Sequence, residues 1–363
     1  MDPAAGGVRR AGGVEAQGVA TDQDRRAPRL SVCVPTYNRP ELLRRAIASI
    51  IAAAPADPER VEIVVSDNSP GVSEGAAREA LGAWDGRCRY LANATNVGIT
   101  ANLNQCIASA SGDFVLFVGD DDQLLPGAID EVLAVLDSDA AADQVLLFGV
   151  DALDDTGRVI RRQRFPGDVR LPPRVALRQL LAGGFAWFPG VVVRRDAVAS
   201  TGTFEHRFGS LTDLELWARL FARYGVRCLP PTIAVYSVHR ASVTQSMDYD
   251  QAAIESVLVI FDRARETGLL AARDIDRCES TFLDQFILGG AYVRLQAGDS
   301  AGARRVLGLY ALPGVRAIGP SRRWQPVRMA FRALSRLPGV VVRPMMSVVT
   351  RFDLVRRVRG AGR

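Results

Sequence analysis

The stretch Phe114-Val115-Leu116-Phe117-Val118-Gly119-Asp120-Asp121-Asp122 carries the strongest structural signal in this 363-residue chain. Its apolar half has the length and composition of a buried strand, and three adjacent carboxylates follow at once. In open α/β sheets, ligands bind in the crevice beyond the carboxyl ends of the strands. Adjacent carboxylates repel one another, so a cation between them explains the cluster better than an Asp-rich turn at a helix start does. Hard oxygen ligands of this kind predict Mg²⁺ or Mn²⁺, and such a metal usually serves a substrate phosphate.

Three strand–loop–helix units precede the acidic cluster. Each has an apolar run, a polar loop and a stretch with helical periodicity. This alternation predicts an α/β fold with a mainly parallel, doubly wound sheet, whose polar loops project at one edge. The predicted strands span 30–34, 61–65 and 89–91, and the predicted helices span 41–54, 74–83 and 103–110.

An ordered set of short motifs lies on these loops. They are Val34-Pro35-Thr36-Tyr37-Asn38-Arg39, Val65-Ser66-Asp67-Asn68, Asn96-Val97-Gly98 with Asn102 and Asn104, Gly112-Asp113, and the acidic cluster itself. Each motif alone is weak, and their order and spacing carry the weight. Through them, residues 30 to about 240 resemble a family 2 glycosyltransferase of the GT-A fold.

The resemblance implies a binding site for a nucleotide-diphospho-sugar donor. Pro35, Thr36 and Asn38 would lie against the nucleotide, and Asp67 would accept a hydrogen bond from the ring N–H of a uracil-type base. A carboxylate only accepts, so it suits the imide N–H of uracil or thymine, and a UDP or dTDP donor is favoured. A bridging water could still admit cytidine or guanosine. Without the resemblance, Asp67 would also fit a simple Asx turn.

The acidic cluster resembles the family's metal motif Asp-x-Asp-Asp, with Gly119 where the first aspartate often stands. Counted back from Pro126, Asp121 would bind the metal directly, and Asp120 would contact the ribose or a metal-bound water. Asp122 is a further candidate ligand. Gly119 leaves open which carboxylates share the Mn²⁺ or Mg²⁺. The cation would bridge the diphosphate and neutralise the leaving group.

Two other loops carry candidate donor contacts. Asn96 and Gly98 would shape the loop that approaches the ribose, or they form an ordinary Asn/Gly turn. The resemblance implies that His239 approaches the metal or the diphosphate, whereas a lone histidine after a strand is otherwise more often a packed or surface residue. Arg240 could offset diphosphate charge in place of His239 or beside it.

A second chemical site is predicted at Leu211-Thr212-Asp213-Leu214-Glu215. The family has an acidic pair here, whose aspartate acts as general base on the acceptor hydroxyl. Asp213 occupies that position, and Thr212 replaces the usual glutamate. Thr212 and Glu215 also fit a capping box, with Asp213 favouring the helix dipole, and the two interpretations are compatible. One base without a protein nucleophile implies transfer with inversion.

Four segments are expected along the chain. Residues 1–28 are rich in Gly, Ala, Arg and Asp and predict a disordered N-terminal lead. Residues 29–245 would form the catalytic domain, and residues 246–320 have the periodicity of a helical extension. Residues 321–363 mix arginines with apolar residues. This tail either lies on an anionic membrane surface or forms a helical cap with a solvated charged face, and it has no apolar span of about 20 residues.

Composition limits partners and location. All 45 basic side chains are arginines, which is typical of a GC-rich coding sequence, so arginine clusters do not indicate a nucleic-acid partner. Five scattered cysteines without metal-ligand spacing favour a reducing cytoplasm, with the inner face of the membrane as the place where the tail would act. The acceptor would be a hydroxyl on a glycan, a glycolipid or a small molecule.

The expected function is therefore inverting sugar transfer to such a hydroxyl, in surface polysaccharide, glycolipid or natural-product glycosylation. Gly119 and Thr212 both depart from the family pattern, so the alternative is a catalytically impaired module of the same fold that binds nucleotide sugars without turnover.

Overall fold

The computed structural model describes residues 27–69, 71–138, 143–238, 249–319 and 321–349. Almost all of the predicted N-terminal lead lies outside the described residues, as do the candidate site residues His239 and Arg240 and residues 350–363 of the tail.

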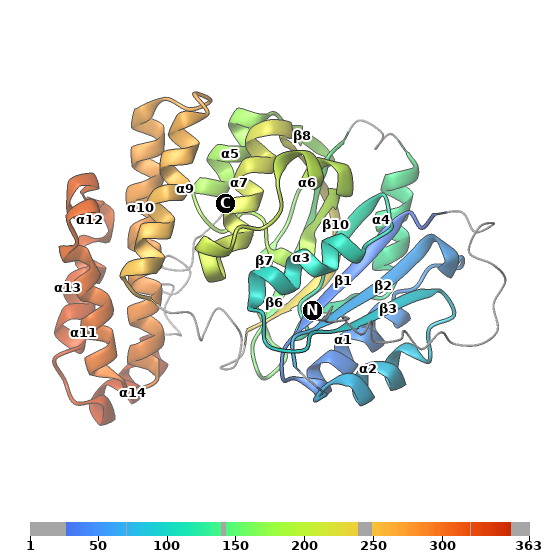
Figure 1. Cartoon of the computed structure of the whole chain (residues 1–363). Helices are drawn as coiled ribbons and strands as arrows, with labels where there is room; N and C mark the ends of the chain where they lie inside the picture. The colour runs from blue at the N-terminus through green and yellow to red at the C-terminus, as the bar shows by residue number, and fades with distance from the viewer. Residues whose placement is uncertain (1–26, 70, 139–142, 239–248, 320, 350–363) are drawn as a thin grey trace, which may run out of the picture.

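One mixed sheet forms the centre of the N-terminal two thirds of the molecule (Figure 1). Within the described residues its strand order is β3-β2-β1-β4-β9-β6-β10-β5, with β7 paired to β6 and β8 to β10. Strands β1 to β4 run parallel, β6 and β10 run parallel, and β9 is antiparallel to both β4 and β6. The strands are β1 (Leu30–Thr36), β2 (Val61–Asp67), β3 (Arg87–Ala92), β4 (Phe114–Phe117), β5 (Gln123–Leu124), β6 (Val145–Leu153), β7 (Val159–Gln163), β8 (Val169–Leu171), β9 (Val191–Arg194) and β10 (Val226–Ser237).

Helices cover both faces of this sheet, and each face has its own buried apolar cluster. One face packs against α1 (Pro40–Ala52), α2 (Glu74–Leu81) and α4 (Ala128–Asp137). The opposite face packs against α3 (Ile99–Ser109), α5 (Pro173–Leu181), α6 (Arg195–Thr201) and α7 (Thr212–Tyr224). The predicted α/β fold with a mainly parallel, doubly wound sheet is confirmed.

Strand β1 shows why its sequence is apolar almost throughout. Leu30, Val32 and Val34 point into the cluster under α1, whereas Cys33 points into the cluster under α3. All four side chains are fully buried. Parallel strands with helices on both sides have no solvent face, so both sets of alternating positions are mostly apolar, and the buried Ser31 hydroxyl is satisfied by Glu62. Polar side chains that can reach a ligand therefore occur beyond the carboxyl end of the strand.

The remaining helices form the predicted extension, which lies beside the sheet domain (Figure 1). They are α9 (Gln251–Glu266), α10 (Ala272–Gln296), α11 (Ser300–Gly308), α12 (Pro313–Ile318), α13 (Gln325–Leu334) and α14 (Gly339–Val349). The break predicted at Gly298-Asp299-Ser300 is present, and Asp299 caps α11 by accepting a hydrogen bond from the Gly302 N–H at 2.7 Å.

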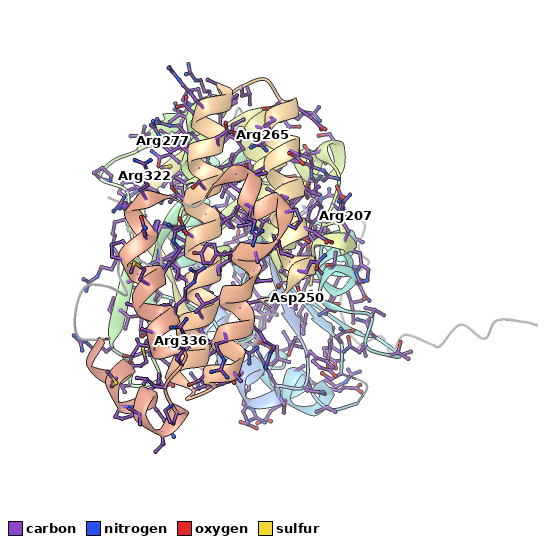
Figure 2. All side chains as sticks on the ribbon, turned by 90° about the vertical axis from the view of Figure 1, so that its left-hand side faces the viewer. Arg207, Asp250, Arg265, Arg277, Arg322 and Arg336 are labelled. Atoms are coloured by element: carbon purple, nitrogen blue, oxygen red, sulfur yellow. The ribbon has the colours of Figure 1, made fainter. Side chains whose placement is uncertain are left out.

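A continuous apolar core joins the extension to the sheet domain. α9 contacts α7, and α10 contacts α5. The cluster that begins under β4 includes Phe261 of α9, Leu295 of α10 and Phe331 of α13, all of them fully buried or nearly so. The outer side of the extension carries many exposed arginines, of which Arg322 and Arg336 are labelled in Figure 2. None of the described helices is both long enough and apolar enough to cross a bilayer.

Candidate active site

The carboxyl ends of β1 and β4 meet because these strands are parallel neighbours, with Cys33 opposite Phe117. The loops beyond them therefore touch. The Thr36 hydroxyl donates to Asp120 Oδ2 at 2.8 Å. Arg39 Nη1 donates to Asp120 Oδ1 at 3.0 Å and to Asp121 Oδ2 at 3.2 Å. The structure thus brings predicted site residues from two loops together, and it adds Arg39, for which the sequence had suggested no role.

Burial is the main electrostatic influence on the acidic cluster. It raises the pKa of Asp120, against the lowering effect of the neighbouring Arg39 charge. It also raises the pKa of Asp122 well above the usual range, and the charge of Asp121 adds to that rise. Asp122 Oδ1 accepts a hydrogen bond from the Ser237 N–H at the end of β10, at 3.0 Å. The cluster therefore connects three strand ends of the sheet.

Gly119 explains how these carboxylates can crowd together. A Cβ atom at this position would lie 3.0 Å from Asp121 Oδ1 and 3.0 Å from Asp122 Oδ2. Two carboxylate oxygens thus converge over the glycine, as donors to Mg²⁺ or Mn²⁺ would. No group of three or more His, Cys, Asp or Glu side chains that could hold a metal occurs among the described residues. These carboxylate oxygens fit a hard cation that takes its other ligands from water and a substrate diphosphate.

Asp67 ends β2 as a fully buried carboxylate. Its Oδ1 accepts a hydrogen bond from the Ser69 N–H at 2.8 Å, so the Asx turn that the sequence allowed is present. Its Oδ2 accepts from the Tyr90 hydroxyl at 2.7 Å. Burial and this contact raise the pKa of Tyr90. Each carboxylate oxygen has a second lone pair, so these contacts leave acceptor capacity for a base N–H.

The loop between β1 and α1 carries the other predicted nucleotide contacts. Pro35 is half-buried and pairs in register with Ser66 of β2. Asn38 adopts a left-handed backbone conformation, with φ of 53°, and its N–H donates to the Ser69 hydroxyl. Pro35, Thr36, Asn38 and Asp67 therefore lie at adjacent strand ends.

Asparagine side chains hold the neighbouring loop in place. Asn68 Nδ2 donates to Asn96 Oδ1 at 2.6 Å, and Asn96 Oδ1 also accepts from the Gly98 N–H at 2.9 Å. Asn93 Nδ2 donates to Asn68 Oδ1 at 3.3 Å and to Asn102 Oδ1 at 3.1 Å. Asn96 and Gly98 thus belong to a built amide network. The sequence did not predict that Asn93 belongs to this network. The available signal was its closeness to two other asparagines.

Asp213 lies in the first turn of α7. It is half-buried, and its Oδ1 accepts a hydrogen bond from the Leu214 N–H at 2.7 Å. Burial raises the pKa of Asp213 to about 6, against the lowering effect of the backbone hydrogen bonds. A carboxylate with this pKa is ionised at neutral pH and still basic enough to accept a proton.

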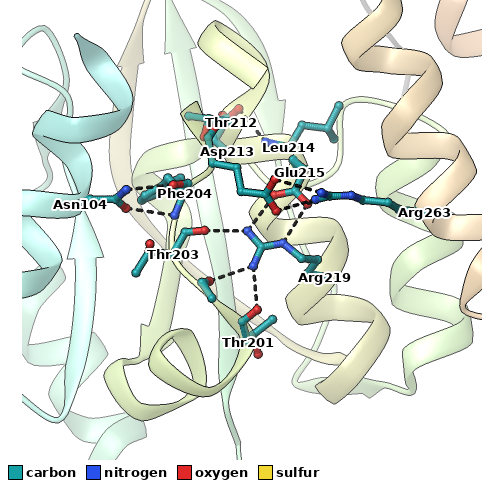
Figure 3. A network of polar contacts seen from close by, with 12 residues as sticks. Asn104, Thr201, Thr203, Phe204, Thr212, Asp213, Leu214, Glu215, Arg219 and Arg263 are labelled. Atoms are coloured by element: carbon teal, nitrogen blue, oxygen red, sulfur yellow. Dashed lines mark hydrogen bonds and ion pairs between the residues drawn. The ribbon is translucent and has the colours of Figure 1, made fainter. Parts of the chain in front are cut away.

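The capping box suggested by Thr212 and Glu215 is wrong. α7 begins at Thr212 itself, and the residue before the helix, Leu211, makes no side-chain cap. Glu215 is instead fully buried and bridges two arginines (Figure 3): it lies 2.7 Å from Arg219 Nη2 and also pairs with Arg263 of α9. These tertiary partners outcompete the local N–H for the carboxylate.

The same network fixes the loop that leads to α7. Arg219 donates to the carbonyl oxygens of Thr201 at 2.8 Å and Thr203 at 2.7 Å (Figure 3). Arg263 also pairs with Glu205 through contacts of 2.7 Å and 2.9 Å. The loop before Asp213 is therefore held from both sides.

Two contacts place this loop against the asparagine network. Asn104 of α3 donates to the Phe204 carbonyl at 2.9 Å and accepts from the Phe204 N–H at 3.0 Å. The ring of His206 lies 3.4 Å from the position that a Cβ on Gly98 would occupy. The segment that leads to Asp213 thus borders the loop predicted to approach the ribose. His239 and Arg240, the other predicted contacts, are outside the described residues.

Comparison with known proteins identifies relatives that match part of the chain. The chain is 30% identical over 220 residues to an uncharacterized protein of Mycobacterium tuberculosis, a match that covers 57% of this chain and 66% of that protein. It is 39% identical over 107 residues to the GalNAc(5)-diNAcBac-PP-undecaprenol beta-1,3-glucosyltransferase of Campylobacter jejuni, covering 29% of this chain and 34% of the relative. The chain thus spans less than two thirds of the length of each relative.

A solved structure shares the fold. S. aureus TarS 1-349 in complex with UDP-GlcNAc superposes with a TM-score of 0.59 at 17% identity, covering 89% of this chain and 91% of that one. The family model described as glycosyl transferase family 2 matches residues 31–241, more than half of the chain. This segment contains the sheet, except for Leu30 at the start of β1, and all the described site residues. The chain therefore belongs to glycosyl transferase family 2.

Proposed function

We propose that this chain is an inverting glycosyltransferase, which moves a sugar from a nucleoside-diphosphate donor to a hydroxyl acceptor. The observation that carries the proposal is the place of the Asp213 carboxyl in the first turn of α7, at the end of a loop that Arg219 and Arg263 hold in position. The segment before it hydrogen-bonds Asn104 of α3, and the ring of His206 lies close to Gly98, in the loop predicted to approach the ribose. This proximity supports Asp213 as a base beside the donor site.

The donor would lie across the ends of β1 and β2. Asp67 would accept the imide N–H of the base, with Pro35, Thr36 and Asn38 against the nucleotide. Asn96 and Gly98 would border the ribose, which Asp120 would also contact. The UDP-GlcNAc complex of S. aureus TarS is consistent with a uridine nucleotide, whereas the structurally similar PcManGT of Pyrobaculum calidifontis is in complex with GDP-Man, so the preference rests on Asp67. UDP or dTDP is therefore the favoured carrier.

Asp121 and Asp122 would hold the Mn²⁺ or Mg²⁺. The bound cation would supply charge neutralisation at the diphosphate leaving group. Arg39 already contacts Asp120 and Asp121 and keeps positive charge at the same place. His239 and Arg240 remain candidate partners of the metal or the diphosphate.

Asp213 would remove the proton of the acceptor hydroxyl as that oxygen attacks the anomeric carbon. Because no protein nucleophile takes part, the new bond forms on the face opposite the leaving group, and the configuration inverts. The C. jejuni relative is named for transfer to a PP-undecaprenol-linked glycan, and a Salmonella typhimurium relative is named an abequosyltransferase. These names support an acceptor in polysaccharide or glycolipid assembly, and a cytoplasmic site of action is part of the proposal.

Calorimetric titration tests the donor site. UDP, dTDP, GDP and CDP would each be titrated with Mn²⁺ and with EDTA, into the natural chain and into Asp121→Ala. We expect metal-dependent binding of UDP or dTDP that the substitution abolishes. No binding to a folded chain would reject the donor site.

Turnover distinguishes an enzyme from a binding module of the same fold. After the nucleotide is known, its sugar derivatives would be incubated with candidate hydroxyl acceptors, and the anomeric configuration of the product would be determined by NMR. A retained configuration would reject inversion. If the chain binds a nucleotide tightly but shows neither sugar transfer nor slow hydrolysis of the donor, the impaired binding module is favoured.

A further inference from the structure

A pocket on the helical extension lies outside the proposed active site. It has a volume of about 450 Å³, within the range of small-molecule sites. Its floor is apolar, since the side chains of Leu307 and Tyr310 are buried there. The lining residues come from α11, the short helix η4 (Leu309–Ala311), α12 and the end of α13, and they are Arg304, Leu307, Gly308, Tyr310, Ala311, Arg316, Arg332, Ser335 and Arg336.

Four of these residues are exposed arginines: Arg304, Arg316, Arg332 and Arg336. Arg304 Nη1 donates to the Ser335 carbonyl at 2.9 Å, a contact that fixes one guanidinium between α11 and the end of α13. Four like charges around one cavity repel one another, and guanidinium groups match the geometry of phosphate oxygens. The pocket is therefore positively charged and lined by groups that can bind phosphate oxygens.

The segment that lines the pocket is strongly basic. Residues 300–349 contain nine arginines and no Asp or Glu, whereas the whole chain carries a net charge of only +5. Within the part of the chain that the structure describes, none of the four pocket arginines forms an ion pair. Arg328, on the same extension, does pair with the buried Asp284 at 3.2 Å. The pocket arginines thus differ from a structural ion-pair network.

Exposed apolar side chains occur on α13, on α14 and in the turn between them. Five of the ten large apolar side chains exposed among the described residues lie between 329 and 345, and they are Met329, Leu337, Val340, Val341 and Met345. Met329 is 64% exposed, and it precedes Arg332 by three positions and Arg336 by seven. Met329 and Arg332 therefore lie on one face of α13, and Arg336 follows in the turn after the helix. A phosphate site with an apolar border suits a lipid headgroup better than a free anion.

We infer that this pocket binds the phosphate headgroup of an anionic lipid. The extension then rests on a negatively charged bilayer, with the arginines at the phosphates and Met329 reaching toward the acyl chains. Basic residues close to an anionic surface and apolar side chains in the interface contribute together to such binding. The inference does not depend on the proposed sugar transfer.

Vesicle co-sedimentation of the full-length chain tests the inference. We expect binding to phosphatidylcholine vesicles that contain phosphatidylglycerol, and little binding to pure phosphatidylcholine. Arg332→Gln/Arg336→Gln should weaken binding to the anionic vesicles about tenfold or more. The control is Arg273→Gln/Arg277→Gln, which removes the same charge from α10. Arg277 and Arg336 lie toward opposite ends of the extension (Figure 2). The control should change binding less than threefold.

Further measurements distinguish a lipid headgroup from other ligands. Met329→Gln should weaken vesicle binding without changing calorimetric titration with inorganic phosphate. An equal loss in both double variants would show general charge attraction and overturn the pocket. Release from vesicles by inorganic phosphate, at concentrations where chloride of equal ionic strength has no effect, would assign the pocket to a free anion and overturn the lipid. Circular dichroism confirms that each variant is folded.

Discussion

At the scale of single residues, Asp213 is the group whose chemistry is most open to test. We expect Asp213→Asn to lower kcat by about 10²- to 10⁴-fold, because the amide cannot accept the acceptor proton. The calorimetric affinity for the donor nucleotide should stay within about twofold, since Asp213 contacts the acceptor in the proposed geometry. An equal loss of nucleotide affinity would instead place Asp213 in the donor site.

The pH profile supplies a second readout for this carboxyl. Burial raises the pKa of Asp213 to about 6, and only the ionised form can act as a base. In the natural chain, kcat/KM should therefore rise with pH below about 6 and level off above it. Asp213→Asn should lose that rise. A rise that persists in the variant would assign the ionisation to another group.

The same carboxyl also changes the stability of the fold. Its pKa in the folded chain, about 6, lies above the ordinary value of 3.8, so the folded state holds the proton more tightly than the unfolded state does. Ionisation therefore costs stability as pH rises from about 4 to about 6. Above that range, Asp213→Asn should be more stable than the natural chain by about 1 to 3 kcal/mol. Urea unfolding at pH 4 and pH 8 measures the difference, which should be smaller at pH 4.

Gly119 gives a test of the acidic cluster. In Gly119→Ala, the new Cβ would lie 3.0 Å from oxygens of both Asp121 and Asp122, so the carboxylates must shift. We expect the Mn²⁺-dependent affinity for UDP to fall about tenfold, by analogy with other changes that reorient metal ligands. Calorimetry in EDTA should show no change. Gly75→Ala is the matched control, because nothing lies within 4 Å of its Cβ position.

At the scale of elements, α7 is held by buried charge. The carboxylate of Glu215 is 1% exposed and lies between Arg219 and Arg263. In Glu215→Ala, Arg263 keeps Glu205 and Arg219 keeps its carbonyl contacts, so we expect a loss of about 1 to 3 kcal/mol of stability. The exposed pair of Glu74 with Arg78 is the control, and Glu74→Ala should cost about 0 to 1 kcal/mol. Equal losses in urea unfolding would contradict a structural role for the buried network.

Elements with local signals were predictable from the sequence. The apolar runs that became β1, β2 and β4 were assigned correctly, as was the glycine break between α10 and α11. Strand β9 was not predicted, although Val191-Val192-Val193 is a β-branched run; its place between β4 and β6 depends on where the chain returns after a long excursion. The antiparallel direction of β9 likewise depends on the route that the chain takes between β4 and β9.

In the site, the sequence predicted contacts between the ends of neighbouring parallel strands and missed contacts that depend on tertiary packing. Thr36 and Asp120 meet as parallel neighbouring strands require. Tyr90 contacts Asp67 only because β3 pairs beside β2 in one register, which no local pattern states. Glu215 was suggested as part of a helix cap because its partner Arg263, far along the chain, could not be foreseen.

At the scale of the whole molecule, the sheet domain and the extension share one core. Ile254, Val257 and Phe261 of α9 are fully buried in the cluster that continues beneath β4. A chain that ends at residue 245 would expose this apolar surface of α5 and α7. We expect it to aggregate or to lose near-UV circular dichroism. A soluble, cooperatively unfolding fragment would show instead that the sheet domain is independent of the helices.

Strand β9 also has a consequence for synthesis on the ribosome. It is the neighbour of β4 on the side away from β1, yet the chain from 118 to 190 must be translated before it emerges. During those seconds the nascent β4, Phe114-Val115-Leu116-Phe117, presents an unpaired apolar edge. At each round of translation, the amino-terminal half therefore passes through a stage in which this strand edge can pair wrongly with other chains. A chaperone that shields emerging chains would raise the yield of native protein.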